Sequence, residues 1–229
     1  ARAFGAAIAR QAHLEALGES EERFRRLADN APDLIYRVAL VPERRFEYVS
    51  SAATRITGYT PEEHYADPDL GLKLVHPDDR YLLEEMAKGD AGTSSALILR
   101  WVRKDGSVIW IEQRNVPIYD KQGAVVALEG IARDITERKQ AERMTQARLQ
   151  IVEFARTHPV DEILQQTLDQ ICALVDSPIG FLHFVEDDGY TLSLQQWSTQ
   201  TMESYCQAEG RGRHYPIDQA GVWVDCVRE

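Results

Sequence analysis

The sequence predicts an α+β fold in two domains that are joined by a helix. Alternating apolar and polar residues mark two strands near residue 40 and three more between residues 95 and 134. Short helical segments separate the two groups of strands, and turns rich in Asp and Gly connect the last three. This order is typical of a five-stranded antiparallel sheet with helices on one side. A chain of 229 residues has room for a second domain.

Composition excludes several classes of function. The net charge of −11 argues against binding to nucleic acid or contact with an anionic membrane, because both surfaces would repel the protein. Three cysteines without a CxxC pair fit reduced thiols in the cytoplasm. No signal peptide or membrane-spanning run is visible in the sequence, although a membrane anchor elsewhere in the parent protein stays open. We therefore expect a cytoplasmic module.

The chain begins with helical sequence. Residues 1–17 are rich in Ala, and Gly18 is expected to end that helix. Ser20 can cap a second helix that stops before Pro32. We therefore assign residues 1–19 to a helical linker that precedes the first domain.

Helix start signals recur between the two groups of strands. Thr60, Pro61 and Glu63 form a complete capping box, in which the cap residue and the Glu three positions later satisfy each other's backbone N–H groups. Pro77 and Asp79 repeat the pattern in "HPDDR". A metal site there is disfavoured, because the side chains that follow His76 do not converge easily on one ion.

Five segments occur in a characteristic order over residues 20 to about 140: "ESEERFRRLADNAPDLIYRV", "GYTPEEH", "VHPDDR", "RWVRKDGSVIWIE" and "ARDITERK". This succession resembles a PAS domain with its C-terminal PAC portion, which we assign to residues 20–134. The resemblance implies a five-stranded antiparallel sheet curved around a small cavity.

Four residues on the predicted strands are candidates for lining such a cavity. Tyr36 shares a strand face with apolar neighbours, and Leu97, Leu99 and Trp101 share a face of a later strand. Ordinary core packing explains the same pattern, so both interpretations stay open.

The resemblance leaves a haem or a non-covalent flavin open as cofactor, and His64 is a candidate axial ligand or a core histidine. Cysteinyl-flavin chemistry is excluded, because no cysteine lies within residues 20–140.

Residues 158–229 resemble the first part of a GAF domain. A helix with a broad apolar stripe is followed by a hairpin around Asp188 and Gly189, and then by "AGVW". The resemblance implies that further strands follow Glu229. No cysteine precedes a histidine here, so a bilin chromophore is not expected. Trp197 and Trp223 border a pocket or belong to the core.

The segment "RDITERK" carries a strand directly into a helix, without a loop. Asp134 and Glu137 have the spacing of an N-cap pair, and Thr136 is a second candidate cap. The resemblance identifies Asp134, Ile135, Thr136 and Glu137 as the joint to a signalling helix, which we assign to residues 135–157. A spacing of three and four residues on that helix, interrupted by Arg148, fits a coiled-coil seam or ordinary packing. The resemblance implies that two copies pair through it. The seam residues are Ala141, Met144, Arg148, Ile151 and Ala155.

The sequence contains no catalytic constellation, neither a nucleophile with its base nor a phosphate-binding loop. It therefore predicts a sensory module that responds to a small molecule or a partner and acts on an output domain in the same chain. By resemblance, the output is a histidine kinase. A diguanylate cyclase or phosphodiesterase, a transcriptional activator, and an oligomerisation scaffold without ligand are the alternatives.

Overall fold

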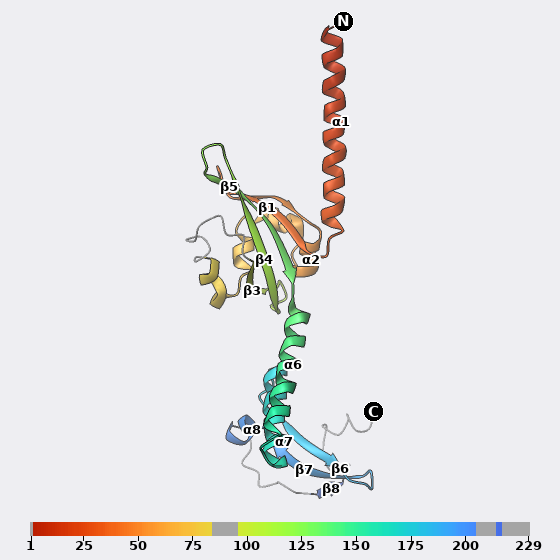
Figure 1. Ribbon diagram of the computed structural model, residues 1–229, viewed down its shortest axis with the longest axis vertical. Coiled ribbons are helices and arrows are strands. Elements are labelled where there is room, and N and C mark those ends of the chain that lie inside the picture. Colours follow the sequence, from red (N-terminus) through yellow and green to blue (C-terminus); the bar gives the residue numbers. More distant parts are fainter. Residues whose placement is uncertain (1, 84–95, 205–213, 217–229) are drawn as a thin grey trace. The chain divides into compact units, whose positions relative to one another are not determined.

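The computed structural model describes residues 2–83, 96–204 and 214–216. The chain divides into two units, Ala1–Lys139 and Gln140–Glu229, and each is described by itself (Figure 1). The predicted helix after residue 217 lies outside the described residues.

Helix α1 runs without interruption from Arg2 to Asp29. The prediction that Gly18 ends a first helix is therefore wrong. Glycine inside a helix costs only about 1 kcal/mol relative to alanine, and this cost does not force a break when the sequence on both sides favours helix. The C-terminal end of α1 is tied to the domain, because the Asp29 carboxylate accepts a hydrogen bond of 3.0 Å from the Ser51 N–H.

The first unit contains a five-stranded antiparallel sheet, as predicted. Its strand order is β2-β1-β5-β4-β3. Strands β1 and β5 pair directly, and this pair joins the first two strands of the chain to the next three. The strands are β1 (Leu34–Ala39), β2 (Arg45–Val49), β3 (Leu97–Val102), β4 (Val108–Tyr119) and β5 (Val125–Asp134).

Short helices lie on one face of this sheet (Figure 1). They are α2 (Ala52–Thr57), α3 (Pro61–Ala66), α4 (Leu70–Lys73) and the 3₁₀ turn η1 (Pro77–Asp79). The capping box predicted at Thr60 and Glu63 is confirmed, with both reciprocal hydrogen bonds present. Gly58 ends α2 at φ 79°, in the left-handed region that favours glycine.

The core of this unit fills the space between the sheet and the helices. Ala53 of α2, Leu99 of β3 and Ile111 of β4 are fully buried there. Successive strand residues alternate between this face and the outer face, so every second side chain of a strand points toward the helices.

The second unit contains most of helix α6 (Thr136–Phe154), which begins in the first unit, and α7 (Val160–Val175). A three-stranded antiparallel sheet follows in the order β6-β7-β8, together with a short helix. These elements are β6 (Phe181–Val185), β7 (Thr191–Trp197), α8 (Thr199–Ser204) and β8 (His214–Pro216).

The hairpin turn predicted for the second unit is confirmed, because Gly189 has φ 67° between the paired strands β6 and β7. Helix α7 begins at Val160. Pro159 occupies the N-cap position of α7 without a side-chain hydrogen bond, and Asp161 lies inside the first turn. There its negative charge interacts favourably with the positive end of the helix dipole and stabilises the helix.

Candidate functional site

The first unit encloses a cavity of about 250 Å³ between the sheet and the helices. Apolar side chains dominate its wall, and a few polar groups interrupt them. The lining residues that matter for its chemistry are Tyr36, Arg44, His64, Trp101, Gln113 and Asn115. Concave, mostly apolar spaces with a small number of placed polar groups are typical of small-molecule sites.

A hydrogen-bonded cluster forms one side of the cavity. The Tyr36 hydroxyl donates to Oδ1 of Asn115 at 2.6 Å and accepts from Nε2 of Gln113 at 2.7 Å. Burial raises the pKa of Tyr36, so this phenol stays neutral across the physiological range. Gly130 lies opposite Tyr36 in the β1–β5 pair, and a Cβ there would overlap the Tyr36 ring. The sheet therefore needs glycine at this position to accommodate the phenol.

His64 is the most deeply buried polar residue of the cavity wall, with 2% of its surface exposed. Its Nδ1 lies 2.9 Å from the carbonyl oxygen of Thr60, one helical turn earlier. Because a carbonyl can only accept, Nδ1 carries the proton and Nε2 has a free lone pair. Burial lowers the pKa of His64, which keeps the ring neutral.

Three buried polar atoms on residues of the cavity wall lack a hydrogen-bond partner: Nε2 of His64, Nε1 of Trp101 and Oε1 of Gln113. Within the described residues, only two further side-chain atoms share this condition, and neither of their residues lines the cavity. Each of these atoms has less than 1 Å² of accessible surface, so none of them is exposed to the cavity. The candidate ligand site is therefore the cavity itself, with its mostly apolar wall and few polar residues.

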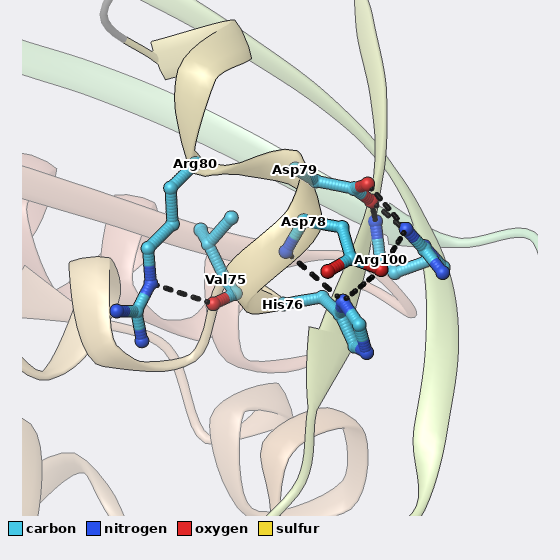
Figure 2. Close-up of polar contacts among 6 residues, drawn as sticks. All are labelled: Val75, His76, Asp78, Asp79, Arg80 and Arg100. Carbon is cyan, nitrogen blue, oxygen red and sulfur yellow. Dashed lines mark hydrogen bonds and ion pairs between the residues drawn. The ribbon is translucent and has the colours of Figure 1, made fainter.

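Strand β3, which contributes Trp101 to the cavity wall, is bound by the carboxylate of Asp79 (Figure 2). The Asp79 carboxylate accepts three hydrogen bonds from Arg100 of β3: from the backbone N–H at 2.7 Å, from Nε at 3.0 Å and from Nη2 at 2.6 Å. These bonds lower the pKa of Asp79. Asp78 is much more exposed and approaches Nη2 only to 3.4 Å. The turn η1 is therefore fixed to β3 mainly through Asp79, with a longer contact from Asp78.

The segment before this turn pairs with β3 and reaches the cavity. Val75 forms an isolated bridge with Trp101, and the Val102 N–H donates to the Leu74 carbonyl at 2.7 Å. Leu74, Val75 and Trp101 all line the cavity. The cavity wall and the Asp79–Arg100 contact thus belong to one hydrogen-bonded stretch of backbone.

A second polar contact fixes the start of helix α6. Oδ1 of Asp134 accepts from the Thr136 N–H at 2.9 Å and from the Thr136 hydroxyl at 2.6 Å. The same hydroxyl oxygen accepts from the Trp110 N–H at 2.9 Å, and the Ile135 N–H donates to the Trp110 carbonyl at 2.8 Å. Strand β5 therefore passes into α6 without a loop, while both sides of the junction are bonded to β4.

The other predicted site residues lie as follows. Leu99 is fully buried and Leu97 packs against the same core, but neither belongs to the cavity wall. Glu137 is exposed, and the Asp134 carboxylate accepts from the Thr136 N–H rather than from the Glu137 N–H, so the two do not form a cap pair. Trp197 of β7 packs edge-on against Phe181 in the second unit. Trp223 lies outside the described residues.

Sequence reasoning did not find Gln113, Asn115 or Arg100. The first two look like solvent-facing residues of a long strand, and no local signal distinguishes them. Arg100 becomes important only because the fold brings Asp79 beside it. In the described part of the chain, no group of three or more His, Cys, Asp or Glu side chains could hold a metal ion. No helix within the same residues is long and apolar enough to cross a membrane.

The five-stranded antiparallel sheet, the helices on one face and the cavity between them agree with the fold that the resemblance to a PAS domain implied. Residues 46–132 match the family described as PAS fold, and the first unit accordingly contains a PAS domain.

Three relatives show where similar sequence occurs. A methyl sulfide methyltransferase-associated sensor of Methanosarcina acetivorans is 29% identical over 98% of this chain and 23% of its own length. The bacterioopsin transcriptional activator of Halobacterium salinarum is 30% identical over 58% of this chain and 20% of its own. Sporulation kinase C of Bacillus subtilis is 29% identical over 54% of this chain and 28% of its own. The chain thus spans less than a third of these relatives.

Proposed function

We propose that this chain is the sensory part of a cytoplasmic signal-transduction protein, in which the PAS cavity binds a small molecule and helix α6 carries the response to an output domain. The observation that carries the proposal is the cavity of about 250 Å³, whose mostly apolar wall is interrupted by a few polar residues.

The route of the response begins at the cavity wall. Arg100 lies beside the lining residue Trp101 on β3 and pairs directly with Trp110 of β4. Its guanidinium lies 5.9 Å from the centre of the Trp110 ring. The Trp110 backbone in turn holds Thr136 and Ile135. A ligand that shifts β3 or β4 would therefore act on the first turn of α6. A signal can be switched if this junction has two packings that differ by a small shift and the ligand binds one of them better.

For the output we propose a histidine kinase. The support is the similarity to a kinase and to a sensor, each of which is several times longer than this chain. A diguanylate cyclase remains the alternative output, because PAS domains precede both kinds of domain. The second unit is proposed as a GAF-like domain on the basis of its helix, hairpin and third strand.

We further propose that the protein pairs with a second copy through α6. Met144, Leu149 and Val152 are large apolar side chains on this helix, and each is at least 49% exposed. Of the predicted seam residues, Ala141, Met144, Arg148 and Ala155 are exposed and Ile151 is half-buried. Leu149 and Val152 are three positions apart and therefore lie on one stripe of the helix, and exposed apolar side chains in such a stripe are suited to helix pairing.

Native mass spectrometry of freshly purified protein tests both parts of the proposal. We expect a dimer that carries a small bound molecule or takes one up from a metabolite mixture, and a visible absorption spectrum would reveal haem or flavin. Leu149→Glu should give monomers, whereas Glu142→Gln, on an exposed position of the same helix, should not. A core that accepts no ligand would instead favour the oligomerisation scaffold.

A further inference from the structure

The cavity of the first unit has a rim where its wall meets solvent. Among the described lining residues, Pro68 and Leu72 are exposed and Arg44 is half-buried. Arg44 makes a hydrogen bond to Asp69, the neighbour of Pro68, so its guanidinium lies at this rim. Trp101, on the inner part of the wall, is only 3% exposed.

The charge of the wall is positive. Among the lining residues that the structure describes, Arg44 is the only one with a formal charge. Burial raises the pKa of Tyr36 and lowers the pKa of His64, so both side chains are neutral at physiological pH. The wall therefore offers a counter-charge to an anion and none to a cation.

Arg44 is held only weakly by its present partner. Its Nη1 lies 3.3 Å from Oδ1 of Asp69, and the two side chains are 36% and 60% exposed. This distance exceeds the usual range of N–H···O hydrogen bonds, and exposed ion pairs contribute little to stability. In contrast, the Asp79 carboxylate binds Nε and Nη2 of Arg100 through both of its oxygens, at 3.0 and 2.6 Å. The Arg44 guanidinium therefore has donors left for a second carboxylate, which it can bind through two parallel hydrogen bonds.

The volume and the inner wall define the body of the ligand. About 250 Å³ lies below the roughly 300–1,000 Å³ of pockets that hold drug-sized ligands. The buried part of the wall includes Phe46, Leu74 and Trp101. An apolar, compact body gains most from burial against such side chains.

We infer that the cavity binds a small carboxylic acid in its ionised form, with a compact apolar body among the buried side chains and its carboxylate on Arg44 at the rim. The ligand takes the place of Asp69, whose exposed carboxylate stays hydrated when it turns to solvent. This inference rests on the proposed function of the cavity and adds the chemical class of the ligand.

Benzoate, benzamide and benzamidine test the charge of the ligand, because they share one shape and are negative, neutral and positive. Isothermal titration calorimetry on the 229-residue chain should rank benzoate as the tightest and benzamidine as the weakest. A cavity in which Arg44 takes no part would bind benzamide more tightly than benzoate, because a carboxylate would lose its hydration without compensation.

Substitutions of Arg44 and Asp69 should change benzoate binding in opposite directions. Arg44→Gln removes the counter-charge and should weaken benzoate about tenfold while benzamide changes little. Asp69→Asn removes the competing carboxylate and should tighten benzoate about threefold. The Asp69 side chain makes no capping hydrogen bond to α4, so this change leaves the helix intact.

Arg45→Gln is the matched control. Arg45 is the next residue in the chain, pairs with Glu47 and does not line the cavity, so the affinity for benzoate should stay unchanged. A merely structural role of Arg44 would instead show itself in Arg44→Gln as an equal loss for benzoate and benzamide.

A measurement on the unaltered protein does not depend on the folding of a variant. Benzoate should shift the Nε–H signal of Arg44 in a nitrogen-15 spectrum, and benzamide should shift it less. If benzamide or benzamidine binds as tightly as benzoate, or if a metabolite without an acidic group is found in the cavity, the assigned ligand class is wrong while the sensing function stands. If none of the three probes nor any molecule of a metabolite mixture binds, the proposed function itself fails.

Discussion

The backbone N–H of Trp110 in β4 donates a 2.9 Å hydrogen bond to the hydroxyl oxygen of Thr136, the first residue of α6. That oxygen also donates its own proton to Asp134, so one hydroxyl links the sheet, the last residue of β5 and the start of the helix. Because Ile135 is 3% exposed and bonded to the Trp110 carbonyl, the junction is fixed from both sides. The first turn of α6 is therefore anchored to β4.

Thr136→Val should weaken this junction. Valine has nearly the same shape but no hydroxyl, so the Trp110 N–H would lose its partner at a cost of about 1–3 kcal/mol. Urea denaturation should show the loss of stability, and hydrogen exchange of the Trp110 amide should accelerate. Thr136→Ser keeps the oxygen and serves as the control. Equal protection of the Trp110 amide in both variants would show that this bond contributes nothing.

Asp134→Ala should lower stability by about 1 kcal/mol, as other lost caps do, and leave the first unit folded. The response of α6 to a bound ligand should nevertheless diminish. Hydrogen exchange of residues 140–154 would measure this, with and without a molecule that native mass spectrometry has shown to bind. Asp120→Ala is the matched control, because Asp120 accepts from the Gln122 and Ala124 N–H groups in a hairpin turn. A ligand response that survives in Asp134→Ala would argue against transmission through this junction.

Asp79→Asn should destabilise the protein by about 1 kcal/mol at neutral pH, because the amide replaces a charged acceptor of three Arg100 hydrogen bonds. The pKa of Asp79 is lowered in the folded state, so its contribution is present above its unfolded value near 4 and is lost as the pH falls through the folded pKa. The difference from the native sequence should therefore shrink in acid. Asp78→Asn, at an exposed position, should have little effect at any pH.

His64 should make stability depend on pH below about 6.5. Its folded pKa is lowered by burial, so the unfolded chain binds the proton more readily. Stability is then complete above the unfolded pKa and falls as the pH drops toward the folded one, by at most about 1.4 kcal/mol per pH unit.

His64→Phe should remove this slope, and His76→Gln should retain it. Urea denaturation from about pH 8 to about pH 5 measures both variants. An unchanged slope in His64→Phe would mean that other groups dominate the titration.

Local signals in the sequence were sufficient for most of the elements. The alternation of strands β1 to β5 and the capping box at Thr60 depend on neighbouring residues only, and the structure confirms both. The helix break expected at Gly18 is absent, because the local signal there was too weak to end the helix. A glycine lowers helix propensity without preventing a helix, so a local signal of that strength does not fix a boundary.

The sequence by itself thus determined the five-stranded sheet, the short helices and the direct passage from Asp134 into a helix. Only the tertiary structure decided that Asp79 meets Arg100, that Trp110 holds Thr136, and that His64, Trp101 and Gln113 line one cavity. The periodicity of a helix or strand depends on residues a few positions apart, whereas these relationships join residues 12 to 49 positions apart. Whether a buried atom finds a partner depends on strand order and on close packing, which no local pattern encodes.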